Sequence, residues 1–453
     1  MKVEEMKRYI DDHAQNIISD LKGFVDIPSV SSDKENVDKA LDYVLQLAKN
    51  MGFEAKSVLN HQVGVIEIGE GEETIGILSH VDVVPPENPQ SWISPPFEMT
   101  ERDGHLWGRG TMDDKGAIIV CLYAMKCLFE SGEPLKKKVQ MILGTQEEVE
   151  WSDMEAYVAN FPLPDYGFTP DGEFPLCNIE KGCMDVELYF DLDETRDRDG
   201  WYFTSILAGQ ATNAVPGSCS CQLVRYQNGA AAESKTLTTT GKPVHSCQPE
   251  KGENAIFNMA DLVAQTEHRE NQISRILMML KEKFSSLYGE EVGLYSESEM
   301  YNGEFVHRNV FAPTLVRTDK NHLLVHINIR FAYGTAETEI ITRLREVAEA
   351  YGGKLQVSSS MPAVYVSKER PFMKAFAQAY EEGSGRKHSF VLAYGGSYAK
   401  AMPGIVSWGP IFPGDEDTCH EDNEHISIKS LLDNGKVFAI ALNKVALSEQ
   451  SFK

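Results

Sequence analysis

The sequence predicts a layered α/β domain that is interrupted by an inserted α+β domain. Patterns typical of helices and strands alternate over residues 1–183 and again over residues 366–453. Between them, residues 184–365 carry longer alternating strands and separate helices. A chain of 453 residues is also too long for one ordinary hydrophobic core. We therefore expect one domain built from both ends of the chain and a second domain inserted into it.

In the N-terminal part, apolar positions recur at helical spacing up to Gly52, and short apolar runs follow. The expected helices cover 4–25, 37–51, about 115–131 and a stretch from about 151, and the expected strands cover 63–68, 74–80 and 138–145. Helices that alternate with strands in this way predict a layered α/β arrangement.

The inserted part begins with an alternating strand, MDVELYFDL, and contains a hairpin around TDKN. Its expected helices cover 253–267, 273–287 and 336–350. The α/β pattern then returns, with helices at 371–382 and 428–446 and strands at SFVLA and GIVSW.

The composition is that of a soluble globular protein, with 42% hydrophobic and 25% charged residues. A formal net charge of -25 argues against nucleic acid or an anionic membrane as a partner. The N-terminus has no signal-peptide pattern, and the longest apolar run, AIIVCLYAM, is too short to span a membrane. The eight cysteines form no CxxC pair, and we interpret Cys219 and Cys221 as alternating strand positions. We therefore expect a cytoplasmic protein.

Five short stretches place histidine and carboxylate side chains at strand ends or loops of the α/β part. They are SHVDVVP with His80 and Asp82, GRGTMDDKG with Asp113 and Asp114, TQEEVEW with Glu147 and Glu148, TPDGEFP with Asp171 and Glu173, and GDEDTCHEDNEH with His420 and Glu424. Taken alone, each is more simply a surface loop, a turn or a helix cap. Because sites in open α/β sheets collect outside the carboxyl ends of the strands, the five together indicate one site. Histidine and carboxylate ligands suit zinc, manganese or cobalt, and two histidines with three carboxylates, one of them bridging, can hold two ions.

The adjacent carboxylates Glu147 and Glu148 follow an apolar strand. Alternation breaks where a strand ends, so neighbouring side chains can reach one cavity from different directions. Metal-assisted hydrolysis needs one carboxylate on the metal and another that is free to carry a proton. Spacing alone does not say which glutamate has which role.

The order of these motifs, H-x-D, G-R-G-x-x-D-D-K-G, E-E, P-D and H-x-x-N-E, resembles the M20 family of co-catalytic metallopeptidases in the aminoacylase/carboxypeptidase G2 clan. GRGTMDDKG, TPDGEFP and GGSYAKAM are most similar to its PepV-type bacterial dipeptidases. The resemblance implies a catalytic domain at residues 1–183 and 366–453, with a lid domain at 184–365. It also implies five metal ligands, of which Asp113 bridges the two ions: His80, Asp113, Glu148, Asp171 and His420. Glu147 would be the general base, Asp82 would orient His80, and the Asp113–Asp114 peptide bond would be cis.

In the inserted part, GKPVHSCQPEKGENA resembles the lid motif whose histidine, here His245, polarises the scissile carbonyl. Without the resemblance, His245 is more simply a loop histidine. The resemblance also implies substrate contacts from Asn213 and Arg330, although an arginine at the end of a hairpin strand is by default a surface charge. The glycine-rich GGSYAKAM adds three further candidates for substrate binding: Gly395, Gly396 and Ser397.

The predicted function is hydrolysis of the peptide bond in unblocked dipeptides, by water that two divalent ions hold. Zinc is expected first, with manganese or cobalt as alternatives. The inserted part is longer than a simple dimerisation domain, so the resemblance implies a monomer. The alternatives are a deacylase of N-acyl amino acids from the same clan and a catalytically silent metal-dependent binding protein. The silent protein is disfavoured because no ligand or base position is substituted.

Overall fold

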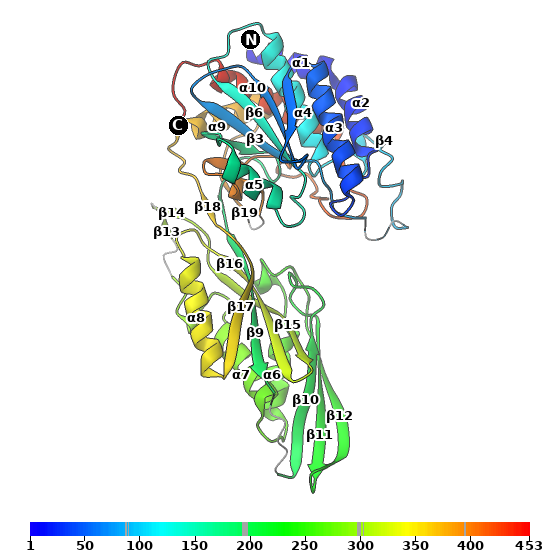
Figure 1. The fold of residues 1–453 in the computed structure, drawn as a ribbon, viewed down its shortest axis with the longest axis vertical. Helices are drawn as coiled ribbons and strands as arrows, with labels where there is room; N and C mark the ends of the chain where they lie inside the picture. Colours follow the sequence, from blue (N-terminus) through cyan, green and yellow to red (C-terminus); the bar gives the residue numbers. More distant parts are fainter. Residues whose placement is uncertain (87, 89, 193–197, 297–299, 302, 394–395) are drawn as a thin grey trace. The chain divides into compact units, whose positions relative to one another are not determined.

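A computed structural model describes residues 1–453 except 87, 89, 193–197, 297–299, 302 and 394–395 (Figure 1). The chain forms two compact units. The first, which we call the α/β unit, contains Met1–Ile179 and Tyr365–Lys453. The second, the inserted unit, contains Glu180–Val364. Among the described residues, every helix is too short or too polar to cross a bilayer.

The α/β unit is built on a mixed sheet with the strand order β1-β2-β6-β3-β7-β20-β8-β18, and β19 also pairs with β8. Its strands are β1 (Glu54–Val58), β2 (Val63–Ile68), β3 (Thr74–His80), β6 (Lys138–Gly144), β7 (Tyr166–Thr169), β8 (Cys177–Glu180), β18 (Val364–Tyr365), β19 (Val391–Ala393) and β20 (Ile405–Ser407). The pairs β3–β6, β3–β7 and β7–β20 are parallel. The parallel strands are therefore at the centre of the sheet, where both faces are covered.

Helices pack on both faces of this sheet (Figure 1). They are α1 (Val3–Asp12), α2 (Ala14–Val25), α3 (Lys34–Asn50), α4 (Lys115–Glu130), α5 (Ser152–Asn160), α9 (Pro371–Ser384), α10 (Ile428–Ala446) and the short helix η3 (Tyr398–Lys400). Helix α10 packs against α4 and α9, and α4 is apolar and buried over most of its length. Residues of α5 and η3 form a separate core cluster with Val63 and Val65 of β2. A helix that is buried nearly all round, as α4 is, is typical of the centre of a large domain.

The central parallel strands end at the same edge of the sheet. His80 at the end of β3 pairs in register with Gly144 at the end of β6. Ile77 of β3 pairs with Phe168 of β7, just before that strand ends. Loops that follow these three strands therefore begin side by side at the carboxyl edge.

A small sheet with the order β21-β5-β4 lies in the same unit. It consists of β4 (Thr100–Arg102), β5 (His105–Trp107) and β21 (His425–Ser427), and all its pairs are antiparallel. Strand β5 leads into the loop before α4, and β21 leads directly into α10. This sheet therefore joins a loop that precedes the inserted unit in the sequence to a loop that follows it.

The inserted unit is an antiparallel sheet with helices, in the strand order β12-β11-β10-β15-β16-β9-β17. The strands are β9 (Gly182–Asp191), β10 (Gly200–Ala208), β11 (Ser218–Gln227), β12 (Ala230–Thr240), β15 (Val310–Asp319), β16 (His322–Phe331) and β17 (Gly353–Met361), with a separate pair of short strands, β13 (Met300–Tyr301) and β14 (Glu304–Phe305). Helices α6 (Ala255–Gln265), α7 (Gln272–Phe284) and α8 (Glu337–Ala350) share one hydrophobic core with this sheet. Two short helices complete the unit: η1 (Pro249–Lys251) and η2 (Glu290–Val292).

The layered α/β unit and the α+β inserted unit confirm the predicted fold class. The predicted strands at 63–68 and 74–80 and the final helix at 428–446 have the observed bounds. The single helix predicted over 4–25 is wrong, because the chain leaves helical geometry at His13 (φ -96°, ψ 6°) and forms α1 and α2. Cys219 and Cys221 are buried alternating residues of β11, as predicted, and all eight cysteines are free thiols.

Candidate functional site

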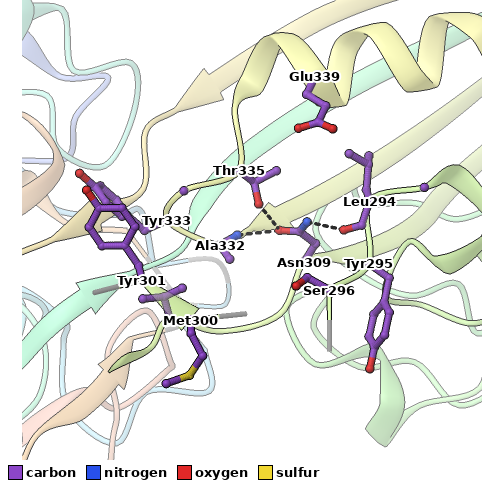
Figure 2. Close-up of a pocket in the computed structure, with 13 residues that line it drawn as sticks. Leu294, Tyr295, Ser296, Met300, Tyr301, Asn309, Ala332, Tyr333, Thr335 and Glu339 are labelled. Carbon is purple, nitrogen blue, oxygen red and sulfur yellow. Dashed lines mark hydrogen bonds between the residues drawn. The ribbon is translucent and has the colours of Figure 1, made fainter. Parts of the chain in front are cut away.

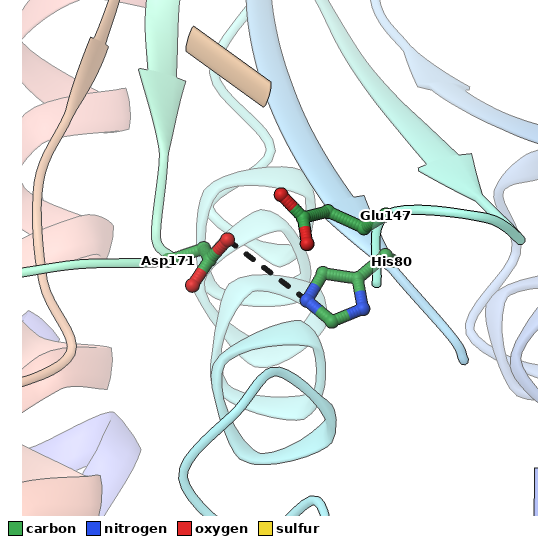
Figure 3. Close-up of side chains that lie close together, drawn as sticks. All are labelled: His80, Glu147 and Asp171. Atoms are coloured by element: carbon green, nitrogen blue, oxygen red, sulfur yellow. Dashed lines mark ion pairs between the residues drawn. The ribbon is translucent and has the colours of Figure 1, made fainter. Parts of the chain in front are cut away.

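Six predicted residues meet at the carboxyl edge of the central strands. His80 ends β3, Glu147 and Glu148 lie in the turn after β6, and Asp171 follows β7. Asp113 comes from the loop before α4, and His420 comes from the loop before β21. We call these six residues the acidic cluster. Figure 3 shows His80, Glu147 and Asp171 turned toward one another from three different segments.

Asp113 lies between the two histidines of the acidic cluster. Its Oδ1 is 3.0 Å from Nε2 of His80, and its Oδ2 is 3.0 Å from Nε2 of His420. The same nitrogen of His420 is 3.1 Å from the carboxylate of Glu148. On the other side, Nε2 of His80 is 3.9 Å from Oδ2 of Asp171. One carboxylate therefore faces both halves of the cluster, as a bridging ligand must.

Asp82 fixes both the ring of His80 and the turn that follows β6. Nδ1 of His80 is 2.9 Å from the main-chain oxygen of Asp82 and 3.4 Å from Oδ1 of its carboxylate. Since a carbonyl only accepts, Nδ1 carries a proton, and in the neutral ring Nε2 has the lone pair that a metal ion would use. The Asp82 carboxylate also accepts hydrogen bonds from the amides of Glu147 (3.2 Å) and Glu148 (3.3 Å). This clamp holds the turn so that both adjacent glutamates reach the same cluster.

Burial and mutual repulsion together raise the pKa values of three carboxylates in the cluster. Burial raises the pKa of Glu147 well above its usual value, and the nearby charge of Asp171 raises it further. Burial and the charge of Asp113 likewise raise the pKa of Asp171 and of Glu148. Burial alone would lower the pKa of His80, but its hydrogen bonds to Asp113 and Asp82 raise it. Several carboxylates are therefore forced together at a cost that a cation would offset.

The acidic cluster fits a metal centre by the chemistry of its donors. Ligand atoms of His80, Glu147 and Asp171 all lie within 4.8 Å of one another, and so do those of His80, Asp113 and Glu148. All donors are imidazole nitrogen or carboxylate oxygen, which suits zinc, manganese or cobalt. The first group contains Glu147 where the resemblance implies Asp113. The geometry alone therefore does not decide which of these two carboxylates binds the ion.

Sequence reasoning did not find the role of Glu424. Its carboxylate has no exposed surface and accepts hydrogen bonds from Arg109 (2.8 Å) and from the amides of Gly110, Met112 and Asp113. The loop that carries Asp113 is therefore held by the loop that carries His420. The Asp113–Asp114 peptide bond in this loop is cis, as the resemblance implies. The sequence contains no indication that Arg109 and Glu424 are partners.

A second pair that the sequence did not predict, Asp153 and Tyr398, lies next to the ring of His80. The Asp153 carboxylate accepts hydrogen bonds from the Thr145 amide (2.6 Å) and from the Tyr398 hydroxyl (2.8 Å). The Tyr398 ring meets His80 edge-on, with ring centroids 6.2 Å apart. Asp153 therefore connects the start of the glutamate turn to the ring that packs on His80.

The predicted substrate residues near Tyr398 lie in the segment before η3. The Ser397 side chain accepts from the Ala399 amide at the start of that helix (3.3 Å). Gly396 is exposed, and a Cβ atom there would lie 2.8 Å from Cε of Lys400. Gly395 lies outside the described residues.

Asn213, His245 and Arg330 lie together within the inserted unit, and we call them the donor group. The Ser246 amide donates to the main-chain oxygen of Asn213 (2.8 Å), and the Ser246 hydroxyl donates to Asn328 on β16 (2.8 Å). Burial lowers the pKa of His245, and the neighbouring charge of Arg330 lowers it further. The Cys247 amide donates to Nδ1 of His245 (3.1 Å), so the proton of the neutral ring is on Nε2. Nε of Arg330 is buried and has no hydrogen-bond partner among the described residues.

The inserted unit also contains a cavity of about 390 Å³ (Figure 2). Asn309 braces its wall by donating to the Leu294 carbonyl and by accepting from the Ala332 amide, both at 2.8 Å. Tyr301 and Tyr333 meet edge-on at another side of the cavity. The side-chain amide of Asn309 is thus hydrogen-bonded to the main chain of the cavity wall. We assign no chemistry to this cavity.

Comparison with known proteins identifies the family. Residues 76–444 match the description "Peptidase family M20/M25/M40". The chain belongs to this family. The M20 match covers most of the α/β unit and the whole inserted unit, so all the motifs of the acidic cluster and the donor group lie within it.

Relatives over the full length carry dipeptidase names. The chain is 30% identical to "Putative dipeptidase YtjP" of Bacillus subtilis (strain 168), over 95% of this chain and 97% of that one. The solved structure of human carnosine dipeptidase 1 shares the fold with a TM-score of 0.64 and 15% identity, over 98% of this chain and 99% of that one. Aminoacylhistidine dipeptidase from Vibrio alginolyticus also shares it, with a TM-score of 0.64 and 15% identity over 96% of each chain. The M20 chain is therefore a peptidase, as predicted.

Proposed function

We propose that this M20 peptidase hydrolyses the peptide bond of unblocked dipeptides with the help of two divalent ions. The observation that carries the proposal is the acidic cluster, in which two histidines and four carboxylates converge at one strand edge. The dipeptidase names of the relatives support the substrate class. Zinc is the proposed metal, with manganese or cobalt as alternatives, because the donors are nitrogen and oxygen.

His80, Asp113 and Asp171 would hold one ion, and Asp113, Glu148 and His420 would hold the other. The contacts of Asp113 with both histidines support its role as the shared ligand. Bound divalent ions would polarise the scissile carbonyl and make water more acidic. Asp82 would keep the ring of His80 in the tautomer that presents Nε2.

Glu147 would carry the proton. Its amide is fixed by Asp82, and its carboxylate lies beside those of Asp171 and Glu148. Burial and those neighbours raise its pKa toward the range in which a carboxylate both accepts and returns a proton. Glu147 would take a proton from the attacking water and pass it to the leaving amine.

The donor group would bind the substrate. We propose that His245 donates its Nε2–H to the oxygen of the scissile carbonyl, where negative charge develops. Arg330 would pair with the terminal carboxylate, since a guanidinium offers two parallel donors. Its buried Nε without a partner supports this assignment. Asn213 is proposed as a further contact, together with Gly395, Gly396 and Ser397.

The test compares hydrolysis of a free dipeptide such as Leu-Ala with hydrolysis of its N-acetyl analogue by the metal-loaded protein. A dipeptidase cleaves the free dipeptide with the larger kcat/KM. Preference for the N-acetyl compound would instead identify a deacylase, and turnover of neither by metal-loaded protein would indicate a silent binding protein. A monomeric state and a cytoplasmic location are also proposed, on the sequence alone.

A further inference from the structure

Two histidines outside the acidic cluster lie on one face of the small sheet. His105 begins β5 and His425 begins β21, and the register pairs His425 with Trp107 and Ser427 with His105. Since alternate residues of a strand share a face, both imidazoles project from the same side. Their ring centroids are 5.2 Å apart, and His425 stacks on Trp107 at 4.0 Å.

The two rings are oriented in the same way by the main chain. Nδ1 of His105 is 2.9 Å from the carbonyl oxygen of Asp103, and Nδ1 of His425 is 2.9 Å from that of Asn423. Asp103 and Asn423 both have positive φ angles, 53° and 65°. A carbonyl only accepts, so in each histidine Nδ1 carries the proton and Nε2 offers its lone pair. This arrangement is the one that orients histidines in metal sites.

The histidines line a cavity of about 230 Å³ together with Met112, Asp415, Glu416 and Ser427. The Glu416 carboxylate is 3.9 Å from Nε2 of His425, and its side chain is 75% exposed. One oxygen of the Asp415 carboxylate accepts from the Ser430 hydroxyl at 2.6 Å, which holds that side chain at the start of α10. Glu416 is the carboxylate that already faces Nε2 of His425, and its exposure leaves it room to turn toward both imidazoles.

We propose that His105, His425 and Glu416 form an additional binding site for a divalent transition-metal ion, with zinc as the preferred ion. Two imidazole nitrogens and one carboxylate match the ligand types of zinc and exclude a preference for calcium or magnesium. In the proposed site, the exposed Glu416 side chain turns toward the two imidazoles, which keep their Nδ1 hydrogen bonds to the main chain. This site is separate from the acidic cluster and does not depend on the proposed function.

The site would also brace the loop that carries His420. Residues 415–425 run from one wall of the cavity past His420 to the other wall at His425. An ion that joins Glu416 to His425 closes this loop at both ends. His105 then ties the closed loop to β5.

The test counts zinc ions. Wild-type protein and the variant His105→Phe, which keeps an aromatic ring but removes the nitrogen, are dialysed against the same buffered free zinc and analysed for metal per chain. We expect the wild type to hold about one ion more than His105→Phe. The variant His61→Ala is the matched control, because His61 also faces a carboxylate (Asp42, 3.2 Å) but is not one of the proposed ligands, and it should keep the wild-type count.

Because His425 packs on Trp107, the variant Glu416→Gln tests the site without changing the packed rings. It should weaken the binding of the extra ion about tenfold or more in competition with a chromophoric chelator, and it should leave the far-ultraviolet circular dichroism unchanged. Equal zinc content in the wild type and His105→Phe would overturn the proposal. So would wild-type zinc affinity in Glu416→Gln. The readout is bound metal, so the result is independent of whether the chain cleaves dipeptides.

Discussion

The acidic cluster of the α/β unit and the donor group of the inserted unit have opposite electrostatic character. In the acidic cluster, four carboxylates lie close to one another, and burial raises the pKa values of Glu147, Glu148 and Asp171. In the donor group, burial and the positive charge of Arg330 lower the pKa of His245, and the guanidinium itself keeps a buried nitrogen that has no partner among the described residues. One region therefore needs a cation, and the other needs an acceptor.

This difference predicts how a substitution in each region changes activity. Removing charge compensation from the acidic cluster should affect every substrate, because the proposed chemistry takes place there. Removing a donor from the inserted unit should affect only the part of the substrate or transition state that the donor contacts. The following experiments test this division.

Metal removal should have the largest effect. Exhaustive chelation should abolish dipeptide hydrolysis, and zinc, manganese or cobalt should restore it, because the nitrogen and oxygen donors discriminate weakly among these ions. Activity is measured before and after chelation, with elemental analysis of the same samples. Full activity in protein shown to be free of metal would contradict the two-metal proposal.

Glu147→Gln should lower kcat by about 10²–10⁴-fold while metal content stays near that of the wild type, because it removes the proton carrier and keeps the size of the side chain. Glu148→Ala should lose one ion and activity together. The exposed Glu150→Gln in the same turn is the control and should behave as the wild type. If Glu147→Gln sheds metal while Glu148→Ala keeps both ions, the two roles are reversed.

His245→Ala should lower kcat by about 10²–10³-fold, as expected for loss of one donor to a developing oxyanion. Metal content should not change, since His245 lies in the inserted unit and the proposed ligands lie in the α/β unit. Steady-state kinetics and elemental analysis check both points. The exposed His322→Ala in the same unit is the control. A wild-type kcat would mean that His245 is only a loop residue.

Arg330→Ala should have the smallest and most selective effect. Loss of hydrogen bonds to a charged group costs about 1.5–3 kcal/mol, so KM for dipeptides should rise about 10- to 100-fold. Dipeptide amides lack the terminal carboxylate and should be affected much less. Arg317→Ala, an exposed position on the same hairpin, serves as the control. Equal changes for acids and amides would remove this role from Arg330.

The sequence predicts local structure best where an element is apolar and bounded by turns. The strands Val63–Ile68 and Thr74–His80 are such elements, and their bounds were predicted. The break at His13 was missed because no proline or glycine marks it. Strand β12 was missed because nearly all of it is exposed and it lacks apolar alternation.

The residues proposed as ligands could be singled out because each lies in a short local motif, and the family match covers all of them. The partners that hold those ligands could not be found. Arg109 and Glu424 are 315 residues apart, and Tyr398 and Asp153 are 245 residues apart. Such pairs follow from the tertiary fold and leave no local pattern in a single sequence.

The strand order of the α/β unit has a consequence for synthesis of the chain. Strand β20, from the C-terminal segment, lies between β7 and β8, which come from the N-terminal segment. The sheet therefore cannot be completed until the segment that follows the inserted unit has been synthesised. The inserted unit is one continuous stretch, Glu180–Val364, and can fold while the earlier strands still wait for β20. His420 lies C-terminal to the inserted unit, so the acidic cluster is completed only after the whole inserted unit has been synthesised.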